Sequence, residues 1–169
     1  MNKIMRGLSI LVLMLTLAGV TAAYDSDNPY TNTIQWIIPS DTSFTVTFSG
    51  SETSIDFDDN VTGQTGDMIE PDGQNSAAST PIIVVNNTGN VNQDFAFNLT
   101  SAKPSWVTSL KVGNTSSYGS ASEVNTEAVT FASAISPAHT TDLYVWCNIS
   151  NATQGTTQRT FMISSSVNE

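Results

Sequence analysis

The sequence predicts an all-β protein: a β-sandwich of about seven to nine strands, preceded by a signal-peptide helix. Two observations predict the sandwich. Apolar and polar residues alternate along several short runs, as in strands with one buried face, and turn-forming residues separate these runs. Beyond the N-terminal segment, no window has the apolar spacing of about 3.6 residues that is typical of an amphipathic helix.

The N-terminal residues predict export from the cell. Lys3 and Arg6 give the chain a positive start, residues 8–17 form an apolar run, and small residues then precede a polar stretch. This order is typical of a secretory signal peptide, here residues 1–23. The apolar run is shorter than the roughly 20 residues that span a bilayer, and a retained membrane anchor is the alternative. We expect a secreted or cell-surface protein with no membrane insertion after cleavage.

Residues 24–30 are expected to form a flexible N-terminal segment, followed by one sandwich domain at 31–166. The polar, Gly- and Pro-containing residues 58–80 predict a long loop. Alternation or a short apolar run predicts strands at Phe44–Phe48, Ile55–Phe57, Ile82–Val85, Phe95–Leu99, Val107–Val112, Val129–Ile135, Leu143–Ile149 and Phe161–Ile163. Their apolar faces predict a core of Phe44, Val46, Phe48, Ile55, Phe57, Ile83, Val85, Phe95, Phe97, Leu99, Val145, Cys147, Phe161 and Ile163.

Charge and cysteine content exclude some classes of protein. The 169 residues carry a formal net charge of −10, and loss of Lys3 and Arg6 with the signal leaves about −12. Nucleic acids and anionic membrane surfaces bind basic patches, so neither is expected as a partner. Cys147 is the only cysteine, which excludes an intrachain disulfide, and its place on an apolar strand face predicts burial rather than intermolecular pairing.

One stretch resembles a known group of proteins. Residues 80–91 form a predicted strand that ends in an Asn-Thr-Gly-Asn turn, and the alternating Phe95–Leu99 follows. This pattern resembles small archaeal secreted surface proteins with immunoglobulin-like sandwiches, and Thr141–Ile163 resembles their final hairpin. The resemblance covers residues 31–166 and implies an immunoglobulin-like fold. Some archaeal threads and bundling pili consist of similar sandwiches joined by strand donation; no catalytic motif carries over.

Residues 33–38 are unusually apolar for a segment so close to a mature N-terminus. Ile34, Trp36 and Ile38 share one face of this predicted strand, and Pro39 ends its hydrogen-bonding ladder. The strand either folds back as the first strand of its own sandwich or inserts into a neighbouring subunit, as a strand donor. Head-to-tail insertion does not close on itself, so it would build a homo-oligomeric fibre.

An acidic stretch is a candidate calcium site. Asp56, Asp58, Asp59 and Asn60 place carboxylate and amide oxygens close together, and these are the ligands that Ca²⁺ prefers. The spacing lacks the Gly and closing Glu of the EF-hand loop, so a solvated acidic strand end is the alternative. No other cofactor is expected.

Glycans are candidate modifications and candidate ligands. Tyr144 and Trp146 share one face of a predicted strand and either stack against sugar rings or pack within the protein. Asn98 and Asn148 are placed on outward strand faces. Together with four asparagines in turns and loops they form the Asn-x-Ser/Thr sequons: Asn60, Asn86, Asn98, Asn114, Asn148 and Asn151.

Catalysis has little support in the sequence. His139 is the only histidine, in a polar turn with Asp142 nearby, and a serine triad needs three groups that converge in space. We therefore expect a non-enzymatic, secreted cell-surface structural protein, a filament or surface-layer-associated subunit that assembles by strand addition. The alternative is an extracellular carbohydrate- or protein-binding module, and a small hydrolase is the third reading.

Signal cleavage is directly testable. Small residues at 21–23 predict that the mature chain begins at Tyr24, or at Ala23 if cleavage falls one residue earlier. Intact-mass spectrometry of the exported protein measures this. A chain that still carries Met1 would instead favour the anchored form.

Overall fold

The computed structural model describes residues 35, 37–57, 65–150 and 157–168, and the sandwich lies in a compact unit, Ile38–Glu169. The predicted all-β class is confirmed, since the described residues form strands and two short 3₁₀ helices but no α-helix. Residues 1–23 and 24–30 lie outside them. In order, the elements are β1 (Phe44–Phe48), β2 (Thr65–Ile69), η1 (Ser76–Ala78), β3 (Ile83–Asn87), β4 (Gln93–Leu99), β5 (Val107–Gly113), η2 (Tyr118–Ser120), β6 (Ser122–Glu123), β7 (Val129–Ile135), β8 (Thr140–Ser150) and β9 (Phe161–Val167).

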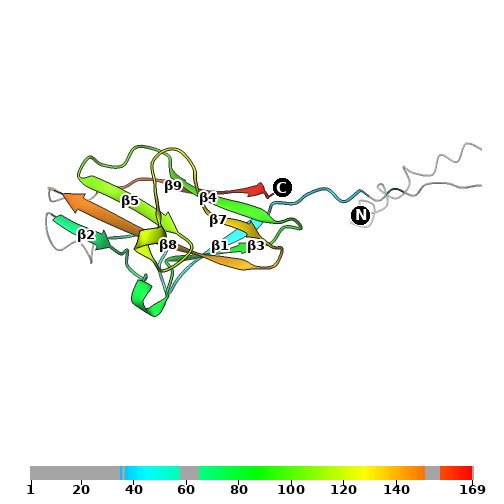
Figure 1. Ribbon diagram of the computed structural model, residues 1–169, viewed down its shortest axis with the longest axis horizontal. Helices are drawn as coiled ribbons and strands as arrows, with labels where there is room; N and C mark the ends of the chain where they lie inside the picture. The colour runs from blue at the N-terminus through cyan, green and yellow to red at the C-terminus, as the bar shows by residue number, and fades with distance from the viewer. Residues whose placement is uncertain (1–34, 36, 58–64, 151–156, 169) are drawn as a thin grey trace, which may run out of the picture. The chain divides into compact units, whose positions relative to one another are not determined.

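These strands form two antiparallel sheets that enclose one core (Figure 1). The larger sheet has the order β1-β3-β8-β5-β6, and the smaller has the order β7-β4-β9. The long strand β8 organises the larger sheet: Thr140–Leu143 pair with β3, whereas Tyr144–Ile149 pair with β5. β2 also pairs with the later half of β8. The predicted two-layer β-sandwich is thus built around one strand of 11 residues.

Consecutive strands mostly lie in different sheets. From β3 onward the chain alternates between the sheets: β3, β5 and β8 lie in the larger sheet, and β4, β7 and β9 lie in the smaller one. The two-residue β6 is the exception, because it follows β5 in the same sheet. Immunoglobulin constant domains instead keep several consecutive strands together in one sheet, so the strand order here differs from theirs. The hairpin predicted at Thr141–Ile163 is wrong for the same reason, because β8 belongs to the larger sheet and β9 pairs with β4 in the smaller one.

Part of the loop predicted at 58–80 is ordered structure. Thr65–Ile69 forms β2 and Ser76–Ala78 forms η1. The Gln74 side chain continues the sheet's hydrogen bonding: its Nε2 donates to the Val145 carbonyl oxygen (2.9 Å), and its Oε1 accepts from the Val145 amide (2.8 Å). The Gln74 side chain thus pairs with the Val145 backbone as the backbone of a neighbouring strand would. A pattern of alternating apolar residues does not indicate such a contact.

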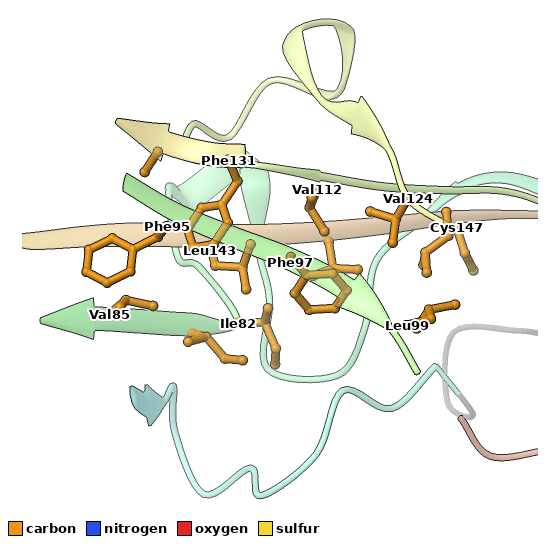
Figure 2. Packing of buried hydrophobic residues seen from close by; sticks show 14 of the residues in the cluster. Ile82, Val85, Phe95, Phe97, Leu99, Val112, Val124, Phe131, Leu143 and Cys147 are labelled. Atoms are coloured by element: carbon orange, nitrogen blue, oxygen red, sulfur yellow. The ribbon is translucent and has the colours of Figure 1, made fainter. Parts of the chain in front are cut away.

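The core lies between the two sheets (Figure 2). Half of the predicted core residues are buried: Ile83, Val85, Phe95, Phe97, Leu99, Val145 and Cys147. A second group is half-buried and packs against them: Phe44, Phe48, Ile55, Phe57, Phe161 and Ile163. The core is completed by Ile82, Leu110, Val112, Val124, Phe131, Ala132, Leu143 and Ile149.

The prediction for Val46 is wrong, because its side chain is 40% exposed. Val46 pairs with the fully buried Val85 and therefore points to the same, inner face of the larger sheet. However, β1 is an edge strand, and among the described residues no strand pairs with its outer side. Alternation indicates the face toward which a side chain points, but not whether that face is covered there.

Phe97 provides a test of the core. It is 1% exposed, and its ring stacks on that of Phe161 with centroids 5.2 Å apart. Phe97→Ala should lower the free energy of unfolding by about 3–5 kcal/mol, because it removes buried apolar atoms and leaves a cavity. The control is Met162→Ala, at a side chain that is 49% exposed, which should cost less than about 0.5 kcal/mol. Urea unfolding measures both, and equal effects would contradict the assigned core.

Candidate functional site

The segment that leads into β1 is held against the turn between β3 and β4. The Asp41 amide donates to Oδ1 of Asn90 (2.7 Å), and the Asn90 amide donates to the Asp41 carbonyl oxygen (3.0 Å). Nδ2 of Asn90 also donates to the Pro39 carbonyl oxygen (2.9 Å). We call this contact, between Pro39–Ser43 and Asn87–Asn90, the N-terminal clamp.

Further hydrogen bonds tie the same segment to both sheets. The Ser43 carbonyl oxygen accepts from the Thr88 amide and from Nε2 of Gln93, each at 3.1 Å. Oγ of Ser165 donates to the Thr42 carbonyl oxygen (2.9 Å). Thr88 adjoins β3 of the larger sheet, whereas Ser165 lies in β9 of the smaller one. The chain in front of β1 is therefore fixed to both layers of the sandwich.

Gly89 allows the two backbones of the clamp to approach. A Cβ at this position would overlap the Asp41 carbonyl oxygen, and it would lie 2.9 Å from the Asp41 carbonyl carbon and 2.7 Å from Nε2 of Gln93. The φ angle of Gly89 is not in the left-handed region, so the lack of space, and not an unusual backbone conformation, requires glycine here.

Two fully buried amide side chains, Asn87 and Gln93, lie beneath the clamp. Nδ2 of Asn87 donates to the carbonyl oxygens of Val91 (2.9 Å) and Ile135 (2.8 Å). Its Oδ1 accepts from the Gly89 amide (2.9 Å) and from Nε2 of Gln93 (2.5 Å). Asn87 thus uses both donors and both lone pairs of its amide, which joins β3, the following turn, β4 and the end of β7.

A carboxylate stabilises the clamp locally. Oδ1 of Asp41 accepts from the hydroxyl (2.6 Å) and the amide (2.9 Å) of Ser43. These two hydrogen bonds lower the pKa of Asp41, because they stabilise the charged form. The segment therefore keeps a fixed turn just ahead of β1.

Apolar residues directly precede the clamp. Ile37 is 77% exposed and Ile38 is 82% exposed. None of the described residues ahead of Phe44 belongs to a strand, so β1 is the first strand that the structure describes. Of the predicted strand donor, Ile34 and Trp36 lie outside the described residues.

The two candidate sugar-stacking residues are buried. Tyr144 and Trp146 are 2% and 1% exposed, and their rings stack 5.9 Å apart. Tyr118 of η2 meets Trp146 edge-on at 6.0 Å, and Nζ of Lys111 lies 4.4 Å from the centre of the Tyr118 ring. These side chains form a second apolar layer on the outer face of β8. The packing interpretation therefore holds, and Tyr144 and Trp146 offer no exposed platform.

The described sequons differ in burial. Asn98 lies between the core residues Phe97 and Leu99, on the face of β4 turned away from the core, as predicted, but this face is covered. Asn98 is 8% exposed, and its Nδ2 donates to the carbonyl oxygen of Thr126 (3.3 Å) in a neighbouring loop. Asn86 and Asn148 are half-buried, and Asn114 is exposed. Asn60 and Asn151 lie outside the described residues.

The candidate calcium ligands are mostly outside the described residues. Asp56 is exposed, and its carbonyl oxygen accepts from the Asp72 amide (2.7 Å). Asp58, Asp59 and Asn60 are not described, so the calcium site stays a prediction. Among the residues that are described, no three His, Cys, Asp or Glu side chains are grouped to hold a metal ion.

The His139 side chain contacts the backbone of its own turn. Its exposed ring places Nδ1 3.0 Å from the Pro137 carbonyl oxygen. Asp142 lies on β8, and burial raises its pKa. In the part of the chain that the structure describes, no serine hydroxyl bonds to His139, so the described geometry contains no serine triad.

Cys147 is buried, as predicted, with 4% of its surface exposed. Burial raises the pKa of its thiol to about 12, because the thiolate would lose its hydration. The thiol therefore stays protonated and unreactive at neutral pH.

Comparisons do not identify a relative. No protein family, curated protein or solved structure matches this chain. The described residues contain no helix with the length and apolar character needed to cross a membrane. Among the described residues, the N-terminal clamp fixes Pro39–Ser43 against the β3–β4 turn and against β9.

Replacement of Gly89 tests the clamp. Gly89→Ala should separate Asp41 from Asn90 and lower the free energy of unfolding by about 1–3 kcal/mol, because the new Cβ overlaps the Asp41 carbonyl group. Gly119→Ala is the matched control, since the nearest atom to its added Cβ is Oγ of Ser117 at 4.0 Å. Hydrogen exchange of the Asp41 and Asn90 amides measures the clamp directly. Equal protection of these amides in both variants would contradict the close approach.

Proposed function

We propose that this chain is a non-enzymatic, secreted structural protein of a cell surface, which assembles into filaments or a surface layer by strand addition. In this proposal, Ile34, Trp36 and Ile38 of one copy enter the sandwich of the next copy. The likeness to immunoglobulin-like surface proteins extends to the two-layer antiparallel sandwich and not to the immunoglobulin strand order.

The observation that carries this proposal is the pair of exposed apolar residues directly ahead of the clamp. Ile37 and Ile38 are 77% and 82% exposed, and burial of two such side chains is worth about 1.5–3 kcal/mol each. Directly after these two residues, the clamp holds Pro39–Ser43 to both sheets. An apolar segment presented in this way is suited to pairing with a sheet edge of another copy.

The edge of β1 is the acceptor that the proposal assigns. β1 has five residues and ends the larger sheet, and its inward-facing Val46 is 40% exposed. A strand added beside β1 would satisfy the free backbone groups of that edge and cover Val46. The donor segment and the acceptor edge are different surfaces, so the contact is head-to-tail and continues from copy to copy.

The alternative function as a carbohydrate-binding module is less well supported. Its candidate residues, Tyr144 and Trp146, are packed under η2 and not exposed. The candidate calcium site at Asp56 and the residues after it would serve as a structural ion site in the proposed protein.

A disulfide experiment tests the assembly. Mature Ile38→Cys chains that carry a mass tag are mixed with untagged Val46→Cys chains and oxidised. Strand addition should give a disulfide-linked dimer that contains one tag, because residue 38 of one copy lies beside β1 of the next. Cys147 should not compete, since it is buried and its pKa is raised to about 12. Non-reducing electrophoresis and mass spectrometry identify the product.

The matched control replaces the acceptor cysteine with Met162→Cys, at a side chain that is also about half exposed but lies on β9. It should give only the small amount of dimer that random collision produces. Equal yields from both mixtures, or a mature protein that stays monomeric at high concentration in electron micrographs and sedimentation, would overturn the proposal.

A further inference from the structure

The four described sequons present their amide nitrogens very differently. N-glycosylation forms a bond to Nδ2 of asparagine, so this nitrogen must be accessible and must not be needed inside the fold. Asn98 fails both conditions: it is 8% exposed, and its Nδ2 donates to the carbonyl oxygens of Leu99 (3.2 Å) and Thr126 (3.3 Å). A sugar on this nitrogen would displace a buried hydrogen bond and the loop above it.

Asn148 and Asn86 are also constrained. Oδ1 of Asn148 accepts from the Met68 amide (2.7 Å) and from the Tyr118 hydroxyl (3.3 Å), which fixes the side chain between β2 and η2. Asn86 lies within β3, and its register places it between Thr45 of β1 and Thr140 of β8. Its Oδ1 is buried. Both side chains are therefore enclosed by neighbouring strands or loops.

Asn114 differs from these three. It is exposed, it follows β5 in the loop before η2, and its neighbour Thr115 is exposed as well. In the described part of the chain, no hydrogen bond engages the Asn114 amide side chain. The third sequon residue, Ser116, lies in the same loop, so the complete motif is presented outside the sheets.

We propose that Asn114 carries an N-linked glycan. In the modification, Nδ2 of Asn114 loses a proton to a base of the transferase and forms a C–N bond to the anomeric carbon of a sugar donor. The donor is a lipid-linked sugar diphosphate, and its diphosphate leaves with the electrons of the broken C–O bond. The amide keeps one N–H and its carbonyl oxygen, so no hydrogen bond of the fold is lost.

The position of Asn114 is compatible with assembly through β1. The order β1-β3-β8-β5 puts three strand spacings between the acceptor edge and β5, or roughly 14 Å at about 4.8 Å per strand. A glycan on Asn86 would instead lie one strand from β1. The proposed modification thus covers the opposite side of the larger sheet with sugar and leaves the acceptor edge open.

The test uses the full chain exported by its native host. Cleavage after Lys, Arg and Glu releases Val112–Glu123, which contains Asn114 and no other sequon. Mass spectrometry should find this peptide with a sugar mass, and the mass should disappear in Asn114→Gln and Ser116→Ala. Ser116→Thr keeps the sequon and should keep the sugar. The peptide that contains Asn98 should carry no sugar on that residue in the folded, exported protein.

The proposal rests on export, which the same spectra measure through the N-terminus. An exported chain beginning at Tyr24 or Ala23 with an unmodified Val112–Glu123 would overturn the glycan and leave the proposed function standing. A sugar mass that persists in Asn114→Gln would also overturn it, since the sugar would then sit on a hydroxyl of the loop. A chain that retains Met1 would overturn the export on which both proposals rest.

Discussion

The buried amide of Asn87 is the interaction on which the geometry of this sandwich depends most. Its side chain donates to the carbonyl oxygens of Val91, after the β3–β4 turn, and of Ile135, at the end of β7. It accepts from the Gly89 amide in the turn and from the side chain of Gln93. Removal of such a group would leave several buried backbone groups unpaired, at about 1–3 kcal/mol each. Apolar packing brings the two sheets together, whereas this polar contact fixes the turn in one position. The chain ahead of β1 is aligned through that turn.

The sequence predicted the strands that alternate and are covered on one face, because burial is the cause of alternation. Phe95–Leu99 and Leu143–Ile149 were found for this reason. It missed β2, because Thr65–Ile69 includes Gly66 and Asp67 and does not alternate apolar and polar residues, whereas the strand is seen in its backbone pairing with β8. It misplaced Val46, because edge position is a property of the whole sheet. The order of the strands in the sheets could not be predicted either, because a local sequence pattern does not indicate which sheet a strand joins.

The candidate site also has features that the sequence predicted and features that it did not. The sequence identified Asn87–Asn90 as a turn, but its partner Asp41 lies 49 residues before Asn90, and no local pattern links them. The aromatic pair on β8 was correctly placed on one face, yet its environment depends on η2, which folds over Trp146 from a separate part of the chain. The sequon at Asn98 looked accessible because alternation placed it opposite the core. A loop that reaches it through Thr126 makes it inaccessible.

The alternation of strands between sheets has a consequence for how this chain reaches its folded state. The smaller sheet has β4 at its centre, and β4 receives its two neighbours only when β7 and then β9 have been added. Likewise, β3 and β5 both pair with β8, which is the next-to-last strand in the sequence. Neither layer can close on an incomplete chain, and contacts between residues far apart in sequence make folding slow. A polypeptide with this connectivity can complete neither sheet until almost its last residue has been synthesised.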